Sequence, residues 1–161
     1  PPDLVLHDLD LLAIPEVFDF GSISGRLDGR IDALRLVDWK ATAFDARLQT
    51  ERRRGTRQRI SQRAVQNISS GGDASCVTSL QGQLIGLSDD FGYRRIGIGC
   101  RLLNEVCRLS GLHSAGQGFT IVQGAGIPRL NVVGFNRDVD WPTLLERLAA
   151  VAGGEVAPVI D

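Results

Sequence analysis

Hydrophobic and polar residues alternate along much of the first third of the chain. Residues 20–33 alternate with a period of two, and residues 43–49 do so again. This period is typical of a β-strand that has one face in water. At residues 34–36 the alternation slips by one position, as a β-bulge would cause. With the leucine-rich stretch at residues 4–14, these patterns predict a β-meander over residues 1–50 that has one polar and one apolar face.

Three later stretches have the apolar spacing of amphipathic helices. Ser61 can act as the N-cap of a helix that ends before Gly71. Apolar residues within 77–91 recur every three or four positions, although two glycines lower the helix propensity there. Residues 140–152 predict a third helix, for which Asp140 is the N-cap. These helices would cover the apolar face of a sheet.

Residues 94–135 predict a second group of strands. Residues 94–102 and 106–110 flank Asn104-Glu105 and read as a hairpin, although Asn-Glu is a weaker turn signal than Asn-Gly. Residues 118–124 and 129–135 are two further strands. We therefore expect an α+β fold: a curved, mostly antiparallel β-sheet, like the end of a β-groove, with two or three amphipathic helices packed against it.

Composition and length fit one domain over residues 1–161. The chain is 43% hydrophobic and 23% charged, which is ordinary for a globular domain. A net charge of −1 argues against a general nucleic-acid binder, and no apolar run is long enough to span a membrane. The chain starts with two prolines and contains no methionine, so we expect a fragment of a longer protein. The predicted organisation is a meander (1–50), a basic linker with helices (51–92), a hairpin and strands (93–135), a C-terminal helix (140–152) and a tail (153–161).

Two of the three cysteines, Cys100 and Cys107, fall on the same face of the predicted hairpin. Directly opposed positions have Cβ atoms about 4.5–5.5 Å apart, within reach of a disulfide after small adjustments. Two buried thiols remain an equally good interpretation of the sequence. A zinc site would need four ligands, and neither His7 nor His113 has a second pair nearby. Cys76 is left over and is expected to be a packing residue.

No stretch has the pattern of a catalytic or cofactor site. His113 lies in a predicted loop with no acidic residue beside it to orient it, and His7 lies on a strand beside Asp8. The pair Asp89-Asp90 has no visible partner for acid–base chemistry. Residues 123–129 contain glycines but lack the spacing of a phosphate-binding loop. We therefore expect no catalytic residue, no metal and no cofactor.

An arginine-rich run separates the meander from the middle of the chain. A solvated linker is the usual role of such a run. It could instead bind an anion, either a phospholipid headgroup or an acidic partner. It lacks the interleaved aromatic residues of single-strand nucleic-acid sites. The run comprises Arg47, Arg52, Arg53, Arg54, Arg57, Arg59 and Arg63.

Several whole segments together resemble the C-terminal region of the YdbH family. These are AsmA-like proteins of Gram-negative envelopes, related to the TamB-type bridging proteins. The resemblance covers about residues 20–150 and lies in the order and wording of segments, with no catalytic signature. The segments are GRLDGRIDALRLVDWKATAFDARL, RISQRAVQNISSGG, DDFGYRRIGIGCRLLNEVCRLSGL and GFTIVQGAGIPRLNVVGFNRDVDWPTLLERL. Glu105 stands where a glycine is expected in the hairpin turn.

The resemblance implies a periplasmic segment of a protein that carries phospholipid from the inner to the outer membrane. An N-terminal helix outside this chain would anchor the parent protein in the inner membrane. A long β-groove would hold the acyl chains on its apolar face, without covalent chemistry. The alternatives are a module that docks on an outer-membrane or periplasmic protein, and a small-solute binding domain of the dicarboxylate type, after an older label of the family.

The implied periplasmic location also changes the interpretation of particular residues. The periplasm is oxidising, so it favours a disulfide between Cys100 and Cys107. The arginines that would contact headgroups or a partner are Arg52, Arg53, Arg54, Arg57 and Arg59. Core packing under the helices is the competing role for most of the residues that would line the groove. These are Ile23, Leu27, Ile31, Phe44, Leu48, Ile96, Ile98, Phe119, Ile121, Leu130 and Val132.

Overall fold

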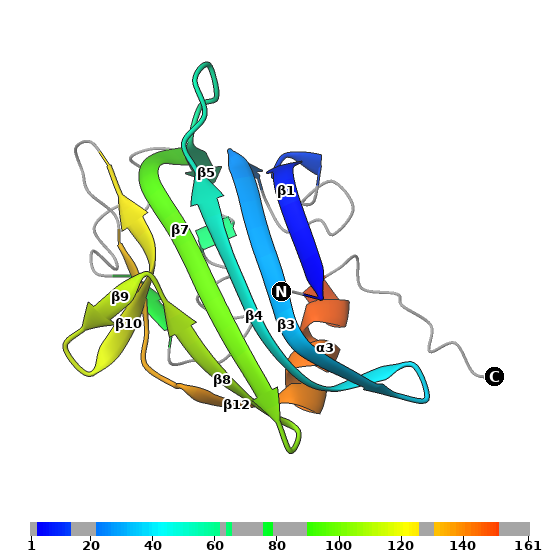
Figure 1. Ribbon diagram of the computed structural model, residues 1–161. Coiled ribbons are helices and arrows are strands. Elements are labelled where there is room, and N and C mark those ends of the chain that lie inside the picture. The colour runs from blue at the N-terminus through cyan, green and yellow to red at the C-terminus, as the bar shows by residue number, and fades with distance from the viewer. Residues whose placement is uncertain are drawn as a thin grey trace.

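A computed structural model describes residues 3–13, 22–61, 64–65, 76–78, 90–125 and 131–151. They form a twelve-stranded antiparallel sheet and one helix (Figure 1). The strands are β1 (Leu4–Asp10), β2 (Ile23–Ser24), β3 (Arg26–Val37), β4 (Lys40–Glu51), β5 (Arg59–Ser61), β6 (Cys76–Thr78), β7 (Asp90–Leu103), β8 (Val106–Gly111), β9 (His113–Ala115), β10 (Gly118–Gly124), β11 (Val132–Gly134) and β12 (Asp138–Asp140), and the helix is α3 (Trp141–Val151).

The first third of the chain forms the meander that its alternation predicts. Strand β1 pairs with β3, and β3 pairs with β4, all antiparallel. The slip in the alternation corresponds to an irregular register between Asp32 and Leu36, where Ala33 has a φ of 52°. The turn between β3 and β4 consists of Asp38 and Trp39, both with positive φ, which is the backbone of a type I′ turn.

The fourteen-residue strand β7 connects the meander to the rest of the sheet. Its first half pairs with β5 on one edge and β10 on the other, and its second half pairs with β4 and β8. The pairing with β10 skips Arg94, and both Arg94 and Arg95 are exposed. This bulge shifts the alternation by one residue, so that Tyr93 and Ile96 both contact the core.

The hairpin of β7 and β8 has its turn at Asn104-Glu105, as predicted. Leu103 pairs with Val106 across the turn, and both turn residues have positive φ. The main-chain N–H of Trp141 donates to the carbonyl of Glu105 at 2.8 Å, which ties the start of α3 to this turn. The end of β8 leads through Leu112 into β9, which pairs with β10.

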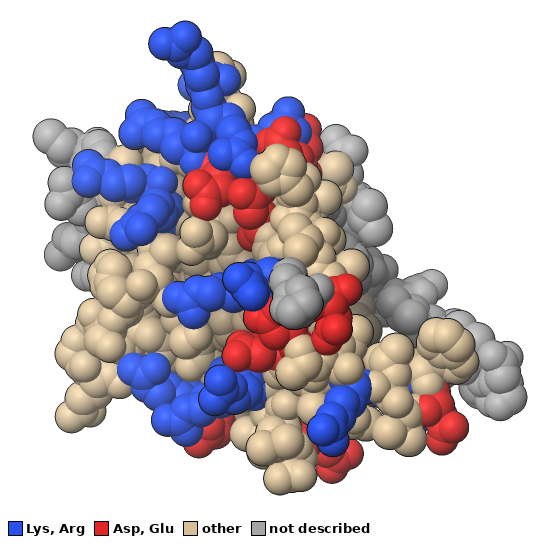
Figure 2. Space-filling model, in the orientation of Figure 1, with Lys and Arg blue, Asp and Glu red and all other residues tan. Residues whose placement is uncertain are grey.

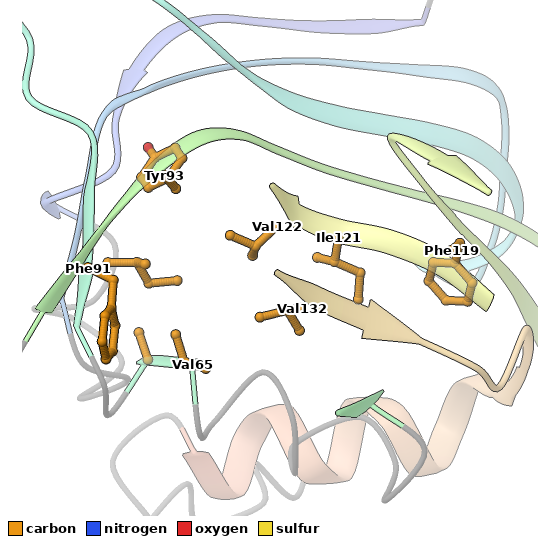
Figure 3. Packing of buried hydrophobic residues seen from close by; sticks show 9 residues of the cluster. Val65, Phe91, Tyr93, Phe119, Ile121, Val122 and Val132 are labelled. Carbon is orange, nitrogen blue, oxygen red and sulfur yellow. The ribbon is translucent and has the colours of Figure 1, made fainter. Parts of the chain in front are cut away.

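The main hydrophobic core lies where the first half of β7 meets β5, β10 and β11 (Figure 3). Phe119 is almost fully buried there, and its ring lies against Gly134 on the neighbouring strand. A Cβ at position 134 would come within 2.7 Å of that ring, so only glycine fits. The guanidinium of Arg137 lies over the ring at 5.2 Å and also donates to the carbonyl of Gly118.

Helix α3 begins at the cap that the sequence predicts. Asp140 accepts hydrogen bonds from the main chain and the hydroxyl of Thr143, at 3.0 and 2.6 Å. These two bonds hold the pKa of the Asp140 carboxyl below its ordinary value. Trp141 packs edge to face on Phe44 of β4, with ring centroids 5.4 Å apart. Figure 1 shows α3 behind β3 and β4.

The expected α+β class with two or three helices is wrong, because the described residues are mostly antiparallel sheet with one helix of 11 residues. Both ends of the predicted helix at 77–91 are strand: Cys76–Thr78 pairs with β11, and the start of β7 pairs with β5. Backbone pairing overrides the local spacing there. Residues 79–89 lie outside the described residues, as does most of the helix predicted after Ser61. Ser61 does accept the N–H of Ala64 at 3.1 Å, as an N-cap would.

Tyr93 of β7 forms a hydrogen bond to the backbone at the junction of β2 and β3. Its hydroxyl donates to the carbonyl of Ser24 at 2.7 Å, and the side chain is 2% exposed. Burial raises the pKa of the Tyr93 phenol, which therefore stays protonated as a donor at neutral pH. Gly25, with a φ of 147°, lies directly under this hydroxyl, where a Cβ would collide with it.

We expect Tyr93→Phe to lower the free energy of unfolding by about 1–3 kcal/mol, because it leaves the Ser24 carbonyl without its donor. Gly25→Ala should be more damaging, since the methyl group meets the hydroxyl and the backbone is strained. The double variant should recover part of that loss, because removing the hydroxyl makes room for the methyl group. Urea unfolding of the four proteins measures the coupling. Strictly additive losses would contradict the contact.

Candidate functional site

The long strands of the sheet have one apolar and one charged face. On the apolar face, Leu48 of β4 lies between Gly29 of β3 and Ile98 of β7, and its side chain crosses Gly29. Leu6 of β1 and Ile31 of β3 belong to the same face. These four aliphatic side chains are only half-buried, whereas a core position would be closed to water. This half-open apolar surface is the candidate functional site.

The residues predicted to face lipid divide into three groups. Leu27, Phe119, Ile121 and Val132 are buried, and Ile23 and Ile96 pack against the main core. Leu130 lies outside the described residues. Half-buried positions on the long strands are Ile31, Phe44, Leu48 and Ile98, and Phe44 is in contact with Trp141. Only this last group leaves apolar surface partly open on the long strands.

Charged side chains form rows across the opposite face (Figure 2). One row of charged side chains crosses β3, β4, β7, β8 and β12. In this row, Asp45 pairs with Arg101 at 3.2 Å and Arg108 pairs with Asp138 at 3.4 Å. All four side chains are largely exposed, so each pair contributes at most about 1 kcal/mol. This face is therefore suited to water, in contrast to the apolar face of the same strands.

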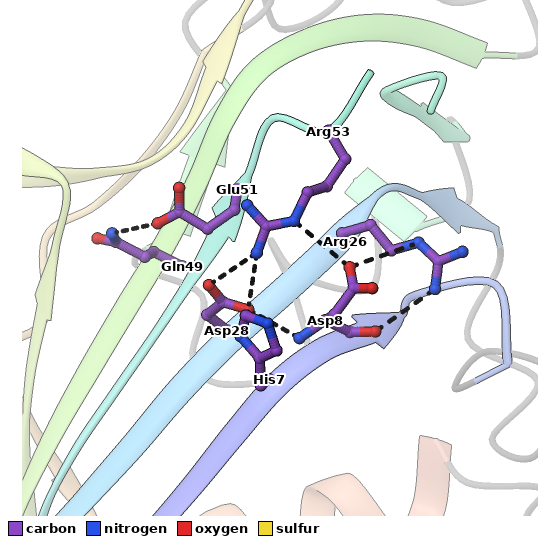
Figure 4. A network of polar contacts seen from close by, with 7 residues as sticks. All are labelled: His7, Asp8, Arg26, Asp28, Gln49, Glu51 and Arg53. Atoms are coloured by element: carbon purple, nitrogen blue, oxygen red, sulfur yellow. Dashed lines mark hydrogen bonds and ion pairs between the residues drawn. The ribbon is translucent and has the colours of Figure 1, made fainter. Parts of the chain in front are cut away.

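A denser network of charges joins the upper ends of β1, β3 and β4 (Figure 4). Asp28 lies at its centre: it accepts the main-chain N–H of Asp8 at 2.8 Å, pairs with Arg53 at 3.2 Å and contacts His7 at 3.4 Å. The Asp8 hydrogen bond is the largest cause that lowers the pKa of the Asp28 carboxyl. Desolvation opposes it, and the nearby charges of Arg53 and His7 lower the pKa further. Asp8 has a φ of 56°, so the network also holds an irregular turn of β1.

The arginine run is partly used within the fold. Arg53 binds Asp28 and also approaches Asp8 at 3.5 Å. Arg52, Arg54 and Arg57 are exposed in the loop that follows β4, and Arg59 is half-buried at the start of β5. A hollow of about 480 Å³ lies beside this loop, lined by both basic and acidic side chains. The predicted headgroup arginines are thus divided among an ion-pair network, an exposed loop and a strand.

Cys100 and Cys107 lie at disulfide distance, with their Cα atoms 5.5 Å apart. The turn register makes them diagonal neighbours, because Leu102 pairs with Cys107 and Cys100 pairs with Leu109. Cys107 is fully buried, and its partner on the neighbouring strand β12 is Val139. The pair lies close to the hairpin turn, where a disulfide would restrain the end of the hairpin.

The two histidines occupy exposed positions. His7 borders a hollow of about 420 Å³ on the charged face, and its contact with Asp28 is part of the network above. His113 is exposed on β9, with Nδ1 3.2 Å from the carbonyl of Ser114. Within the described ranges, no three histidine, cysteine, aspartate or glutamate side chains are grouped as metal ligands would be.

One feature of the surface was missed by the sequence analysis. Several large apolar side chains are exposed at the tips of two hairpins, among them Trp39, which is 92% exposed. A hollow of about 910 Å³ lies between these tips and the start of α3, lined in part by Val37, Leu103 and Leu145. The signal was present in the turn sequence Val-Asp-Trp-Lys, which places a tryptophan where a hairpin usually has a small or polar residue.

Comparisons of the chain with models of known protein families, with curated proteins and with solved structures found no match. The resemblance to the YdbH family therefore stays a prediction. The one helix in the described part of the chain is too short to cross a bilayer.

We expect Asp28 to make folding stability depend on pH. Because its pKa is lower in the folded chain, its contribution is fully present above the unfolded value of about 3.9 and is lost as the pH falls through the folded pKa. Asp28→Asn should therefore unfold more easily than the native chain at pH 7, and the difference should shrink at pH 2. Urea unfolding at a series of pH values measures this. The control is Asp138→Asn, whose carboxyl is 61% exposed and should matter little.

We also expect reduction of the cysteine pair to lower the free energy of unfolding by about 2–3 kcal/mol, as the entropy of a short closed loop predicts. The oxidised chain should show one free thiol, from Cys76, and the reduced chain three. Thiol counting by mass spectrometry and urea unfolding measure both quantities. The variant Cys100→Ala/Cys107→Ala should then be insensitive to reductant. Three free thiols in protein from an oxidising compartment would contradict the disulfide.

Proposed function

We propose that this chain is a non-enzymatic, periplasmic segment of an AsmA-like protein that takes part in phospholipid transport between the inner and outer membranes. In this role it binds acyl chains along the apolar face of β1, β3, β4 and β7, or caps a longer groove that does so. The observation that carries the proposal is that Leu6, Ile31, Leu48 and Ile98 share one face of these strands and are only half-buried.

The driving force would be the hydrophobic effect. Burying apolar surface stabilises by about 25 cal/mol per Å², and an acyl chain presents apolar surface along its whole length. A long strand face is a suitable partner, because side chains two residues apart repeat along one line. Leu48 and Ile98 are partners on neighbouring strands, and Ile31 lies on the same face of β3, opposite Ala46.

Two further features support the proposal. The charged outer face keeps the same strands soluble while their other face is apolar, so lipid could be held without exposing it fully to water. The cysteine pair at disulfide distance fits an oxidising compartment such as the periplasm. The predicted resemblance to the YdbH family assigns the same compartment and the same ligand class.

The binding surface is narrower than the sequence predicts. Leu27, Phe119, Ile121 and Val132 serve the fold, because their side chains are already enclosed by neighbouring strands. A charge at Leu27 would therefore test stability and not lipid passage. The alternatives are a docking module for a protein partner and a small-solute binding domain. Arg53, one of the arginines that would contact a partner, is already paired with Asp28.

The first experiment asks whether lipid accompanies the protein. We expect phospholipid at near-stoichiometric yield in an organic-solvent extract of the chain, purified from periplasmic expression without detergent and analysed by mass spectrometry. Leu48→Asp should lose most of this lipid. Gln49→Asp is the matched control, because its side chain lies on the charged face of the same strand. Circular dichroism confirms that both variants fold.

A photo-crosslinking amino acid at position 48 or 49 tests the same surface without adding a charge. Crosslinks to phospholipid from position 48, and far fewer from position 49, would support the proposal. No lipid in the native extract and no crosslink from position 48 would overturn it. The search would then turn to protein partners.

A further inference from the structure

The strongest unexplained feature outside the proposed groove is the exposed tryptophan in the turn between β3 and β4. Trp39 is 92% exposed, although tryptophan is the side chain with the most apolar surface to bury. Around it, Leu36 and Val37 on the same hairpin and Leu103 and Val106 on the neighbouring hairpin are between 40% and 60% exposed. Single exposed apolar residues are ordinary, but a group at one end of a molecule marks an interaction surface.

The backbone makes this tryptophan costly for the fold. Trp39 occupies the second central position of a type I′ turn with a φ of 62°, where glycine is strongly preferred. A bulky residue in the left-handed region of backbone conformation destabilises the folded chain. Because the Trp39 side chain is exposed, its packing contacts offset little of this destabilisation. Folding stability therefore does not explain a tryptophan at this position, whereas contact with another molecule or surface does.

The shape of the surface points to a bilayer. The two turns project from the same end of the sheet (Figure 1). A hollow between them reaches Trp141 and Leu145 of α3. Separate apolar tips that carry an aromatic residue are suited to entering the boundary between headgroups and acyl chains, which lies about 5–10 Å deep. Tryptophan is enriched at that depth, because its ring is apolar and its N–H can bond to the headgroup region.

The charges at the tips indicate how binding would depend on the lipid. Arg35 and Lys40 flank the turn, and in the described part of the chain neither pairs with a carboxylate, so both can reach phosphate groups. Asp38 and Glu105 in the two turns balance them. With no net charge, the tips should bind mainly by burial of apolar surface and only weakly through the charge of the membrane.

We propose that the tips of the β3–β4 and β7–β8 hairpins form a membrane-docking surface that inserts Trp39 and Leu103 into the headgroup boundary of a phospholipid bilayer. This surface is distinct from the proposed acyl-binding face. It would hold the end of the sheet against a membrane whether or not the sheet carries lipid.

The chain allows a direct test because it has only two tryptophans. In the variant Trp141→Phe, which keeps an aromatic ring against Phe44, all tryptophan fluorescence comes from Trp39. On addition of phosphatidylethanolamine–phosphatidylglycerol vesicles, its emission should shift to shorter wavelength. Lipids brominated on the acyl chain should quench it. Phosphatidylcholine vesicles should give a similar response, since apolar burial is the main attraction.

Paired glycine variants separate docking from folding. Trp39→Gly should bind vesicles about tenfold more weakly, because it removes the large side chain that the bilayer would bury. Its Tm should rise by about 2–4 °C, because glycine relieves the backbone strain of the turn. Glu105→Gly makes the same change in the equivalent position of the other turn, and should raise Tm while binding to uncharged phosphatidylcholine vesicles stays unchanged. Leu103→Ser should weaken binding. Val5→Ser, which is equally exposed but lies on β1, should not.

Emission of Trp39 that stays unshifted at saturating vesicle concentration would overturn the proposal. So would vesicle binding of Trp39→Gly equal to that of the native chain, or a requirement for the tips in binding a protein with no binding to vesicles. Lipid co-purified with Trp39→Gly is measured in parallel, and we expect it to match the native chain. A loss of vesicle docking with retained lipid, or the reverse, shows which of the two proposed surfaces is correct.

Discussion

The structure depends on strand β7, which pairs with four other strands and is continuous across the molecule. Its first half holds Phe91 and Tyr93 in the main core, and its second half holds Ile98 and Leu102 on the apolar face of the long strands. These two sets differ in phase by one residue. The bulge at Arg94 is what allows both to face inward, because a strict period of two would turn one set toward water.

The two halves of the molecule consequently differ in how completely their apolar side chains are buried. Around Tyr93 and Phe119, strands fold over one another, and the side chains are almost fully buried (Figure 3). Along β3 and β4, the same alternation produces Ile31 and Leu48, which are only half-buried. The closed half supplies the stability that lets the other half keep apolar surface open. A binding face needs such support, since exposed apolar surface contributes nothing to folding until a ligand covers it.

Much of the sheet could be predicted because its signals are local. The period of two predicted β3, β4 and even the irregularity near Ala33, and the Asn104-Glu105 turn was placed correctly. The stretch from 77 to 91 failed because partners far away in the chain decide it: β6 is a strand because β11 lies beside it. Alternation also identified which residues share a face, but not which of them are covered. Leu27 and Ile31 have the same phase, yet only Leu27 is buried.

The two type I′ turns show how the fold can carry unfavourable residues at its tips. Each has a non-glycine residue at the strained second position, Trp39 in one and Glu105 in the other. The first turn is held by two strands of twelve residues each, whose pairing far outweighs one strained residue. The second has a shorter partner strand, and there the cysteine pair lies at disulfide distance beside the turn, where a bond would close the hairpin. The turn residues therefore do not have to stabilise their own hairpins, because the strands that flank them do so. Their side chains can instead contact a surface outside the protein.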